Sequence, residues 1–418
     1  MTIIEEITQL CREAKEASYK LSIMSAKDKN RVLKKMASKI RESKNYLIDK
    51  NKEDLEAGIK AGLNSAMLDR LTLNEKRIED MAAGIDKIAL LTDPVGEVIK
   101  GWSPESGIKI NKVKVPIGVI GMIFESRPNV TADSAALALK SGNAIVLRGG
   151  KEAINSNIAL ALILKSALEE EGIHKGAISL IENIDRDGVR VLSQMTDYVD
   201  VIIPRGGSGL IQAVVENAKV PVIFHDKGLC HTFVDEFADI EMAKNICINA
   251  KVQRPGVCNA METLLVHEKI ADKFLPVMAA EFLRAGVKLR GCENTRKILK
   301  NIEAATEEDW ATEYLELILS IKIVNGIEEA IEHINKYGSK HSDAIITDSY
   351  ENSKLFTTAV DSATVYVNAS TRFTDGSCFG FGAEIGISTN KLHARGPVAL
   401  EELTTYKYII EGSGQVRV

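Results

Sequence analysis

The chain has 418 residues, which is too long for one ordinary hydrophobic core and predicts two or three domains. It is 45% hydrophobic and 27% charged, a composition typical of soluble globular proteins. The formal net charge of −5 argues against a surface for nucleic acids or other polyanions, but it is compatible with a local basic pocket for a phosphorylated metabolite.

Targeting, membrane, disulfide and metal signals are all missing from the sequence. The first six residues lack the basic and apolar regions of a secretory signal, and no apolar run approaches the ~18 residues of a membrane span. The six cysteines form no CxxC pair, and the seven histidines show no HExxH or paired His/Cys spacing. We therefore expect a cytoplasmic protein without disulfide bonds, a bound metal or a membrane segment.

The first part of the chain, up to about residue 92, has helical periodicity. Apolar residues recur at helical spacing at Ile7, Leu10, Cys11 and Ala14, and charged residues fill the other faces. This pattern predicts an α-helical cap around a later sheet.

From about residue 113 strand-like and helical segments alternate. Strands are expected at 113–124, 144–148, 177–181, 199–203 and 220–224, and helices at 131–141, 153–171, 189–195 and 210–218. This alternation predicts βαβ units and a parallel sheet, in which ligands bind beyond the carboxyl ends of the strands.

A second α/β segment follows. It has an expected helix at 269–285, strands at 317–324 and 343–347, and a helix at 327–337 between those two strands. Segments 96–100 and 108–115 predict a hairpin, and residues 404–411 are rich in strand-forming residues.

Three glycine-rich breaks, at 148–151, 204–209 and 226–229, are expected at strand ends. Glycines between a strand and a helix let backbone donors approach a phosphate at the helix start. None of the three matches the GxGxxG fingerprint, so ordinary tight turns explain the pattern equally well.

Cys258 is the strongest candidate for a chemical role. It lies in an expected turn, 253–260, just ahead of the strand-like run 263–266, and this position suits attack on a carbonyl better than core filling. A free thiol is only ~3% ionised at pH 7, and lowering its pKa to about 7 needs about 2 kcal/mol of local stabilisation. Arg254, backbone N–H groups or a helix start are candidates to supply it. The alternative is a small buried hydrophobic residue.

Several motifs together carry a family resemblance that covers essentially the whole chain. They are Phe124-Glu125-Ser126-Arg127-Pro128-Asn129, Gln253 to Asn259 around Cys258, Ala330 to Ile334 with His341-Ser342-Asp343, Val367 to Gly376, and Phe379 to Glu384 with His393 to Pro397. In this order they resemble the aldehyde dehydrogenase superfamily, and within it the branch that reduces an acyl phosphate of glutamate.

The resemblance implies an α/β fold with a parallel-sheet cofactor domain, an α/β catalytic domain and a small β oligomerisation element. The cofactor domain would span 1–95 and 116–224, with a late return near 365–385. The catalytic domain would span 225–364 and contain Cys258. The oligomerisation element would combine the hairpin 96–115 with 386–418.

The activity that the resemblance implies is NADPH-dependent reduction of L-glutamyl 5-phosphate to L-glutamate 5-semialdehyde and phosphate, the second step of proline biosynthesis. It further implies a homo-oligomer, either a dimer or a tetramer, and a transient association with glutamate 5-kinase. Neither a nucleic acid nor a membrane is expected as a partner.

Site residues follow from the same resemblance. Cys258 would form a thioester, and backbone N–H at Cys258 and a donor from 126–129 would hold the oxyanion. Substrate would contact Ser126, Arg127, Asn129, Arg254, Thr371 and Arg372, with Arg127 or Arg254 on the leaving phosphate. The cofactor would contact Arg148, Gly149, Gly150, Lys151, Gly206, Gly207, Ser208 and Glu313. The alternative for each arginine is a structural role, and the alternative for Lys151 and Glu313 is a solvated charge.

Two departures from the wider superfamily are informative. Hydrolytic members place a water-activating Glu in the segment that matches 225–229, where this chain has none, although Asp226 lies there. NAD-linked members carry a carboxylate where 148–151 has two cations, Arg148 and Lys151, which favours the 2′-phosphate of NADP(H). The alternatives are a hydrolytic NAD(P)-dependent aldehyde dehydrogenase acting on a small semialdehyde, or a binding module without catalysis.

Overall fold

The computed structural model describes residues 2–417, which form two compact units. The first unit contains the described residues up to Phe224, then Gly380–Gly386 and the residues from Val398 onward. The second unit contains His225–Phe379 and Ile387–Pro397. Among residues 2–417 no helix combines the length and the apolar character that crossing a membrane requires.

Five helices open the first unit, as the periodicity predicts. Side chains that cap their N-termini explain where several of them begin: Thr2 and Glu5 form a reciprocal capping box, and Ser25, Asn64 and Asn74 each accept from a backbone N–H of the first turn. The helices are α1 (Ile3–Leu21), α2 (Ala26–Glu42), α3 (Lys44–Lys60), α4 (Ser65–Leu71) and α5 (Glu75–Leu90).

A four-stranded parallel sheet of order β5-β4-β3-β6 lies at the centre of this unit. The chain moves across the sheet from β3 to β5 and then returns to β6. Because connections between parallel strands are right-handed, α6 and α7 lie on one face of the sheet, and α8 lies on the other face together with α1. The elements are β3 (Val119–Phe124), α6 (Asn129–Lys140), β4 (Ala144–Arg148), the 3-10 turn Lys151–Ala153, α7 (Ile154–Glu170), the 3-10 turn Lys175–Ala177, β5 (Ile178–Leu180), α8 (Asp187–Ser193), β6 (Val201–Arg205) and α9 (Ser208–Asn217).

Two strand predictions in this region were wrong in detail. The single expected strand 113–124 is two strands, β2 (Lys109–Pro116) and β3, which belong to different sheets. Gly118 separates them with φ 131°, where a Cβ would lie 2.2 Å from Asp200 Oδ2. The expected strand 220–224 makes only one bridge, from Val222 to Ile202, because Pro221 has no N–H to extend a ladder.

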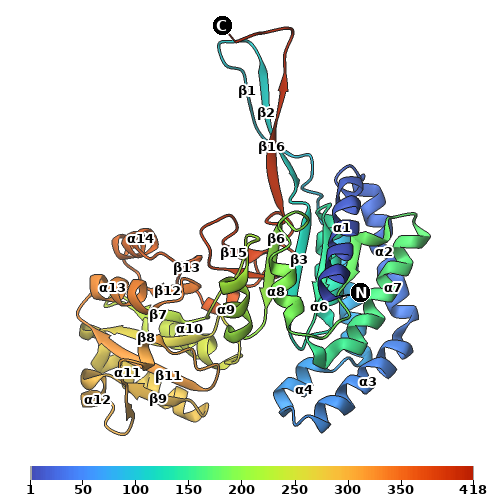
Figure 1. Ribbon diagram of the computed structural model, residues 1–418. Coiled ribbons are helices and arrows are strands. Elements are labelled where there is room, and N and C mark those ends of the chain that lie inside the picture. The colour runs from blue at the N-terminus through green and yellow to red at the C-terminus, as the bar shows by residue number, and fades with distance from the viewer. Residues whose placement is uncertain (1, 418) are drawn as a thin grey trace. The chain divides into compact units, whose positions relative to one another are not determined.

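An antiparallel arm completes the first unit. β1 (Val98–Trp102) and β16 (Thr404–Glu411) pair on either side of β2, and Figure 1 shows this ribbon extending away from the helices and sheet of the unit. Trp102 and Tyr408 meet edge to face with ring centroids 6.1 Å apart. The hairpin predicted from 96–100 and 108–115 is therefore present and carries a third strand.

The second unit is built on a seven-stranded parallel sheet of order β10-β9-β11-β8-β7-β12-β13. Helices α10 and α11 bury one apolar cluster on one face, and α13 and α14 bury another against Phe233, Leu265 and Ile345. The elements are β7 (Cys230–Val234), α10 (Ile240–Val252), β8 (Met261–His267), α11 (Glu268–Arg284), β9 (Lys288–Gly291), α12 (Glu293–Ile298), β10 (Glu303–Ala304), the 3-10 turn Asp309–Ala311, β11 (Ile318–Val324), α13 (Ile327–Tyr337), β12 (Ser342–Ile346), α14 (Tyr350–Ala359), β13 (Thr364–Val367) and the 3-10 turn Thr371–Phe373.

Unit membership near the C-terminus differs from the expectation. Residues 365–379 lie in the second unit, because β13 pairs with β12, so only 380–386 return to the first unit. Residues 387–397 also lie in the second unit, where Arg395 and Lys391 pair with Asp361 at 3.0 and 2.9 Å. A short pair of strands, β14 (Gly386–Ser388) and β15 (Gly396–Val398), forms at these crossings.

A buried histidine in the second unit lies in the motif Ala330 to Ile334 but was given no role of its own. His333 on α13 packs against the rings of His231, Trp310 and Tyr337, with centroid distances of 5.6, 5.4 and 4.7 Å. Burial, helped by neighbouring positive charge, lowers the pKa of His333 to about 2. The folded protein therefore holds this ring neutral.

We expect His333 to make the stability of the second unit depend on pH. An unfolded histidine titrates near 6.5, so its contribution is complete above about pH 6.5 and is lost as the pH falls below it, by about 1.4 kcal/mol per pH unit. The change His333→Phe should reduce the slope of unfolding free energy against pH by about that amount between about pH 6 and about pH 5. Urea unfolding measures it. The exposed control His393→Phe should keep the original slope, and equal slopes in both variants would contradict the argument.

Candidate active site

Cys258 lies in the turn between α10 and β8, half-buried and ahead of the strand as predicted. This turn is at the amino end of β8, so the carboxyl-end rule for parallel sheets does not locate it. No helix starts at Cys258: α10 ends at Val252 and a strand follows. The helix dipole proposed as one source of thiolate stabilisation is therefore wrong, which leaves backbone donors and arginines.

Gly228, just ahead of β7, and Cys230, the first residue of β7, support the backbone of Cys258. A Cβ on Gly228 would lie 2.1 Å from the Cys258 carbonyl oxygen and 2.2 Å from its Cα, so only glycine fits there. The Cys230 thiol donates to the same carbonyl oxygen at 3.2 Å. Burial raises the pKa of Cys230 well above its ordinary value, so Cys230 remains a neutral donor.

The loop after β13 fixes the other side of the turn. Thr371 Oγ1 donates to the Asn259 carbonyl at 2.7 Å, and Asn259 Nδ2 donates to the Thr374 carbonyl at 2.9 Å. Thr371 is fully buried, so its hydroxyl holds the turn. The expectation that Thr371 contacts substrate stays a prediction, and in this structure its hydroxyl donates to the Asn259 carbonyl.

Two of the predicted substrate arginines lie in this unit. Arg254 is exposed, and Arg372 is half-buried with Nε donating to Gln253 Oε1 at 2.9 Å. Burial lowers the pKa of Arg372, and the charge of Arg254 adds to that effect while the charge of Cys258 opposes it. The two guanidinium groups and the Cys258 sulfur therefore share one electrostatic environment, in which an anion would relieve the repulsion between the cations.

Glu313, expected at the nicotinamide ribose, also lies beside the Cys258 turn. Its Oε1 accepts from the Gly228 N–H at 2.8 Å. Burial raises the pKa of Glu313, the Gly228 hydrogen bond and Lys227 oppose the rise, and Asp226 adds to it. The solvated-charge alternative is wrong for this residue, because its carboxylate is largely buried and bonded to backbone.

The predicted residues of segment 126–129 lie in the first unit. Ser126, with φ 43°, donates through N and Oγ to Glu152 Oε1 at 3.0 and 2.6 Å, and Asn129 Nδ2 donates to Asp133 Oδ2 at 2.7 Å. Both side chains thus have internal partners. Arg127 is half-buried in the same segment.

Arg148 is a structural residue rather than an exposed cation. It is 6% exposed, and its guanidinium donates to the carbonyls of Gly149, Ile184 and Asp185. Gly149 is required by packing, since its Cβ would lie 2.2 Å from Asn157 Nδ2. Lys151, in contrast, is exposed. The charge argument for a phosphate at this turn therefore depends on Lys151 alone.

The second glycine-rich break has the predicted geometry. Gly206 and Gly207 are exposed between β6 and the ten-residue helix α9, and Ser208 begins the helix without a side-chain cap. Glu125 Oε2 accepts from the Gly207 N–H at 2.9 Å. The third break, 226–229, leads into β7 instead of connecting a strand to a helix, so its predicted place at a strand end was wrong.

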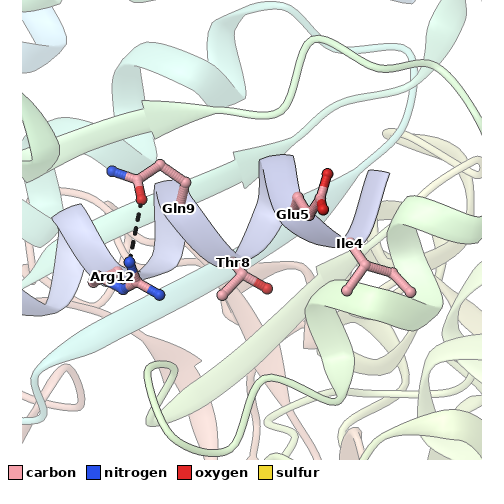
Figure 2. Close-up of a pocket in the computed structure, with 5 residues that line it drawn as sticks. All are labelled: Ile4, Glu5, Thr8, Gln9 and Arg12. Atoms are coloured by element: carbon pink, nitrogen blue, oxygen red, sulfur yellow. Dashed lines mark hydrogen bonds between the residues drawn. The ribbon is translucent and has the colours of Figure 1, made fainter. Parts of the chain in front are cut away.

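A shallow hollow on α1 lies outside these residues. Figure 2 shows that one exposed helix surface lines it, and Arg12 Nη1 donates to Gln9 Oε1 at 3.5 Å. The residues around it are Ile4, Glu5, Thr8, Gln9 and Arg12. None of them was predicted to act chemically, and the hollow contains no nucleophile.

Sequence reasoning missed the residues that hold the turn. Gly228 and Cys230 are distant in the chain from Asn259, and no local motif indicates that β7 and β8 bring them together. Glu152 was also missed, although it directly follows the segment 148–151 that was judged to lack a carboxylate. The Asn after the nucleophile, Asn259, was the one signal available.

Comparison with known proteins gives the family. Residues 4–295 match the model of the aldehyde dehydrogenase family. Two curated relatives named gamma-glutamyl phosphate reductase are each 56% identical to this chain. The match to the protein of Caldanaerobacter subterraneus subsp. tengcongensis runs over 412 residues and covers 99% of this chain and 100% of the relative. The match to the protein of Moorella thermoacetica runs over 417 residues and covers 100% of both chains.

A solved structure agrees with these relatives. The crystal structure of gamma-glutamyl phosphate reductase from Thermotoga maritima has a TM-score of 0.97 and 50% identity, and the match covers 99% of this chain and 100% of that one. Members of the family use a nicotinamide cofactor. This chain belongs to the aldehyde dehydrogenase family, and within it to the γ-glutamyl phosphate reductases.

Proposed function

We propose that this chain reduces L-glutamyl 5-phosphate to L-glutamate 5-semialdehyde and phosphate with NADPH, through a thioester on Cys258. The observation that carries the proposal is the pair of guanidinium groups, Arg254 and Arg372, in the electrostatic environment of Cys258. An acyl phosphate brings anionic charge to the carbonyl that is attacked, and arginine is well suited to bind it. The relatives of the same name support the choice of substrate.

Cys258 performs the covalent chemistry. Its thiolate attacks the acyl carbonyl, the bond from that carbon to the phosphate oxygen breaks, and phosphate leaves with the bonding electrons. The bound cofactor supplies the hydride that reduces the thioester. Collapse of the resulting thiohemiacetal breaks the bond between the substrate carbon and the Cys258 sulfur, which releases the aldehyde and regenerates the Cys258 thiolate.

The arginines have separate tasks in this proposal. Arg254 is exposed and lies four residues before the nucleophile, so we assign it to the leaving phosphate. Arg372 is held by Gln253, which suits a fixed contact to the substrate's amino-acid carboxylate. Gly228, Cys230 and Thr371 keep the Cys258 backbone in place while the sulfur reacts.

Several residues, each considered within its own unit, carry groups that suit parts of a nicotinamide cofactor. Ser208 and Gly209 are exposed at the start of α9, where backbone N–H groups favour a phosphate, and a Cβ on Gly209 would meet nothing within 4 Å. Glu313 offers a carboxylate oxygen to ribose hydroxyl groups. Lys151 is the cation available for a 2′-phosphate.

The arm suits the proposed homo-oligomer. Its strands expose Val98, Trp102, Tyr406, Tyr408 and Ile410, which is a large apolar surface for an edge ribbon. A second copy of the chain would cover these side chains.

The function is tested by supplying L-glutamyl 5-phosphate from a separate kinase reaction and following NADPH absorbance and semialdehyde together. We expect the loss of NADPH and the formation of semialdehyde to be equal. One phosphate should be released for each NADPH oxidised, in addition to any phosphate that the kinase reaction itself produces. NADPH oxidation that depends on a simple aldehyde but not on the acyl phosphate would overturn the proposal.

Lys151 should determine the preference for NADPH over NADH. A charge-assisted contact to phosphate contributes about 1.5–3 kcal/mol, so kcat/KM should favour NADPH by about tenfold or more. The change Lys151→Glu should remove or reverse that preference, and Lys151→Gln should lie between. Initial rates with both cofactors measure it. Equal kcat/KM values for NADPH and NADH in the unaltered enzyme would refute the role of Lys151.

A further inference from the structure

A fully buried ion pair lies beneath the Cys258 turn and belongs to none of the roles assigned above. Lys251, near the end of α10, and Glu262, on β8, are both 0% exposed, and their Nζ and Oε2 atoms are 2.6 Å apart. Burial raises the pKa of Glu262, and the Lys251 ammonium opposes that rise. A buried pair of this kind is weak support for stability, because apolar residues of similar size often serve as well. Its presence requires another explanation.

The second oxygen of Glu262 has a specific partner. Oε1 accepts from the backbone N–H of Leu315 at 3.1 Å. Leu315 has φ 56°, a left-handed conformation that residues with a Cβ rarely adopt and that needs support from its surroundings. Its side chain is 43% exposed, so apolar burial does not supply that support. The hydrogen bond from the Leu315 N–H to Glu262 supports this conformation instead.

Leu315 in turn determines where Glu313 lies. The Leu315 carbonyl oxygen faces Gly256, at 3.6 Å from the position of a Cβ there, and Glu313 accepts from Gly228. Gly256 lies in the Cys258 turn, and Gly228 packs against the Cys258 backbone. The short segment from Glu313 to Leu315 thus lies against the turn at both ends, through the hydrogen bond from Gly228 and through the Leu315 carbonyl near Gly256.

We propose that Glu262, paired with Lys251, is a positioning residue that holds Leu315 in its left-handed conformation and so aims the Glu313 carboxylate at the cofactor ribose. This inference rests on the cofactor role of Glu313 in the proposed function. The 2.6 Å contact with Lys251 holds the Glu262 side chain in place, so that its second oxygen stays within hydrogen-bonding distance of the Leu315 N–H.

Substitutions at Leu315 test the inference without altering the buried pair. Leu315→Pro removes the N–H and forces φ to about −65°, while Leu315→Asn keeps the N–H and tolerates the left-handed region. We expect Leu315→Pro to raise the dissociation constant of NADPH, measured by fluorescence titration, about tenfold or more, and Leu315→Asn to change it by less than about twofold. The KM for L-glutamyl 5-phosphate should stay the same in both.

A second pair of variants changes the buried ion pair and leaves Leu315 unaltered. Lys251→Met with Glu262→Gln keeps an acceptor for Leu315 without the charges, and Lys251→Met with Glu262→Met removes it. We expect only the second combination to weaken NADPH binding. A purely structural role predicts that urea midpoints fall while the dissociation constant of NADPH is the same in all four variants, and that result would overturn the inference.

Glu313→Gln, measured in parallel, distinguishes a failure of the cofactor role of Glu313 from a failure of the positioning role of Glu262. If Glu313→Gln leaves NADPH affinity unchanged, the cofactor role of Glu313 in the proposed function is wrong. If Glu313→Gln weakens binding while Leu315→Pro does not, the cofactor role stands and the positioning role of Glu262 is rejected.

Discussion

Replacing Cys258 by Ala or Ser should abolish reduction of L-glutamyl 5-phosphate, with kcat lower by about 10⁴-fold or more, while the fold persists. The covalent step has no substitute nucleophile: Cys230 lies behind the turn and its raised pKa keeps it a neutral thiol. The side chain of Cys258 is half-buried in a turn whose backbone is held by other residues, so its loss removes little packing.

The control for this prediction is Cys378→Ser. Cys378 is exposed in the loop that follows Thr371, and its removal should leave kcat within about twofold. Single-turnover rates and urea unfolding curves distinguish lost chemistry from lost folding. Turnover near that of the unaltered enzyme in the Cys258 variant would eliminate the thioester mechanism.

The regular elements were predictable from the sequence because their signals are local. The helix Ile327–Tyr337 and the strands Ala144–Arg148 and Thr404–Glu411 match the predicted bounds, since periodicity and flanking glycines act over a few residues. β7, α10 and β13 were not predicted. Cys230–Val234 carries the polar residues His231 and Thr232 inside a fully buried strand, and such a strand lacks a clear pattern.

The nucleophile was predictable and most of its surroundings were not. Pro, Gly and Asn around Cys258 indicate a turn from the sequence alone. Tertiary contacts decide whether an arginine faces solvent or a carbonyl. Arg148 and Arg254 look alike in the sequence, but the Arg148 guanidinium donates to backbone carbonyls, whereas Arg254 is exposed to solvent. The internal partner of Thr371 was unpredictable for the same reason, because Asn259, which accepts from its hydroxyl, is 112 residues away.

The reverse reaction gives the sharpest separation between a reductase of acyl phosphates and a hydrolytic dehydrogenase. Segment 225–229 contains no Glu, so the thioester on Cys258 should resist water and need phosphate, or arsenate in its place, to release the acyl group. General-base assistance contributes about 10²–10⁴-fold, so the dependence on phosphate should be large. The two carboxylates nearby do not change this expectation, because Glu313 is bonded to Gly228 and Asp226 is exposed to solvent.

We therefore expect NADP⁺ reduction at saturating glutamate semialdehyde to be near zero without phosphate and to rise to a plateau as phosphate is added, with arsenate giving free glutamate instead of the acyl phosphate. Initial rates measure it. Asp226→Asn and Glu313→Gln should leave the rate at zero phosphate unchanged. A high rate at zero phosphate that yields free glutamate, and that Asp226→Asn removes, would identify Asp226 as a water-activating base. The chain would then act as a hydrolytic enzyme, because the rate of thioester hydrolysis determines whether the acyl group leaves to water or to phosphate.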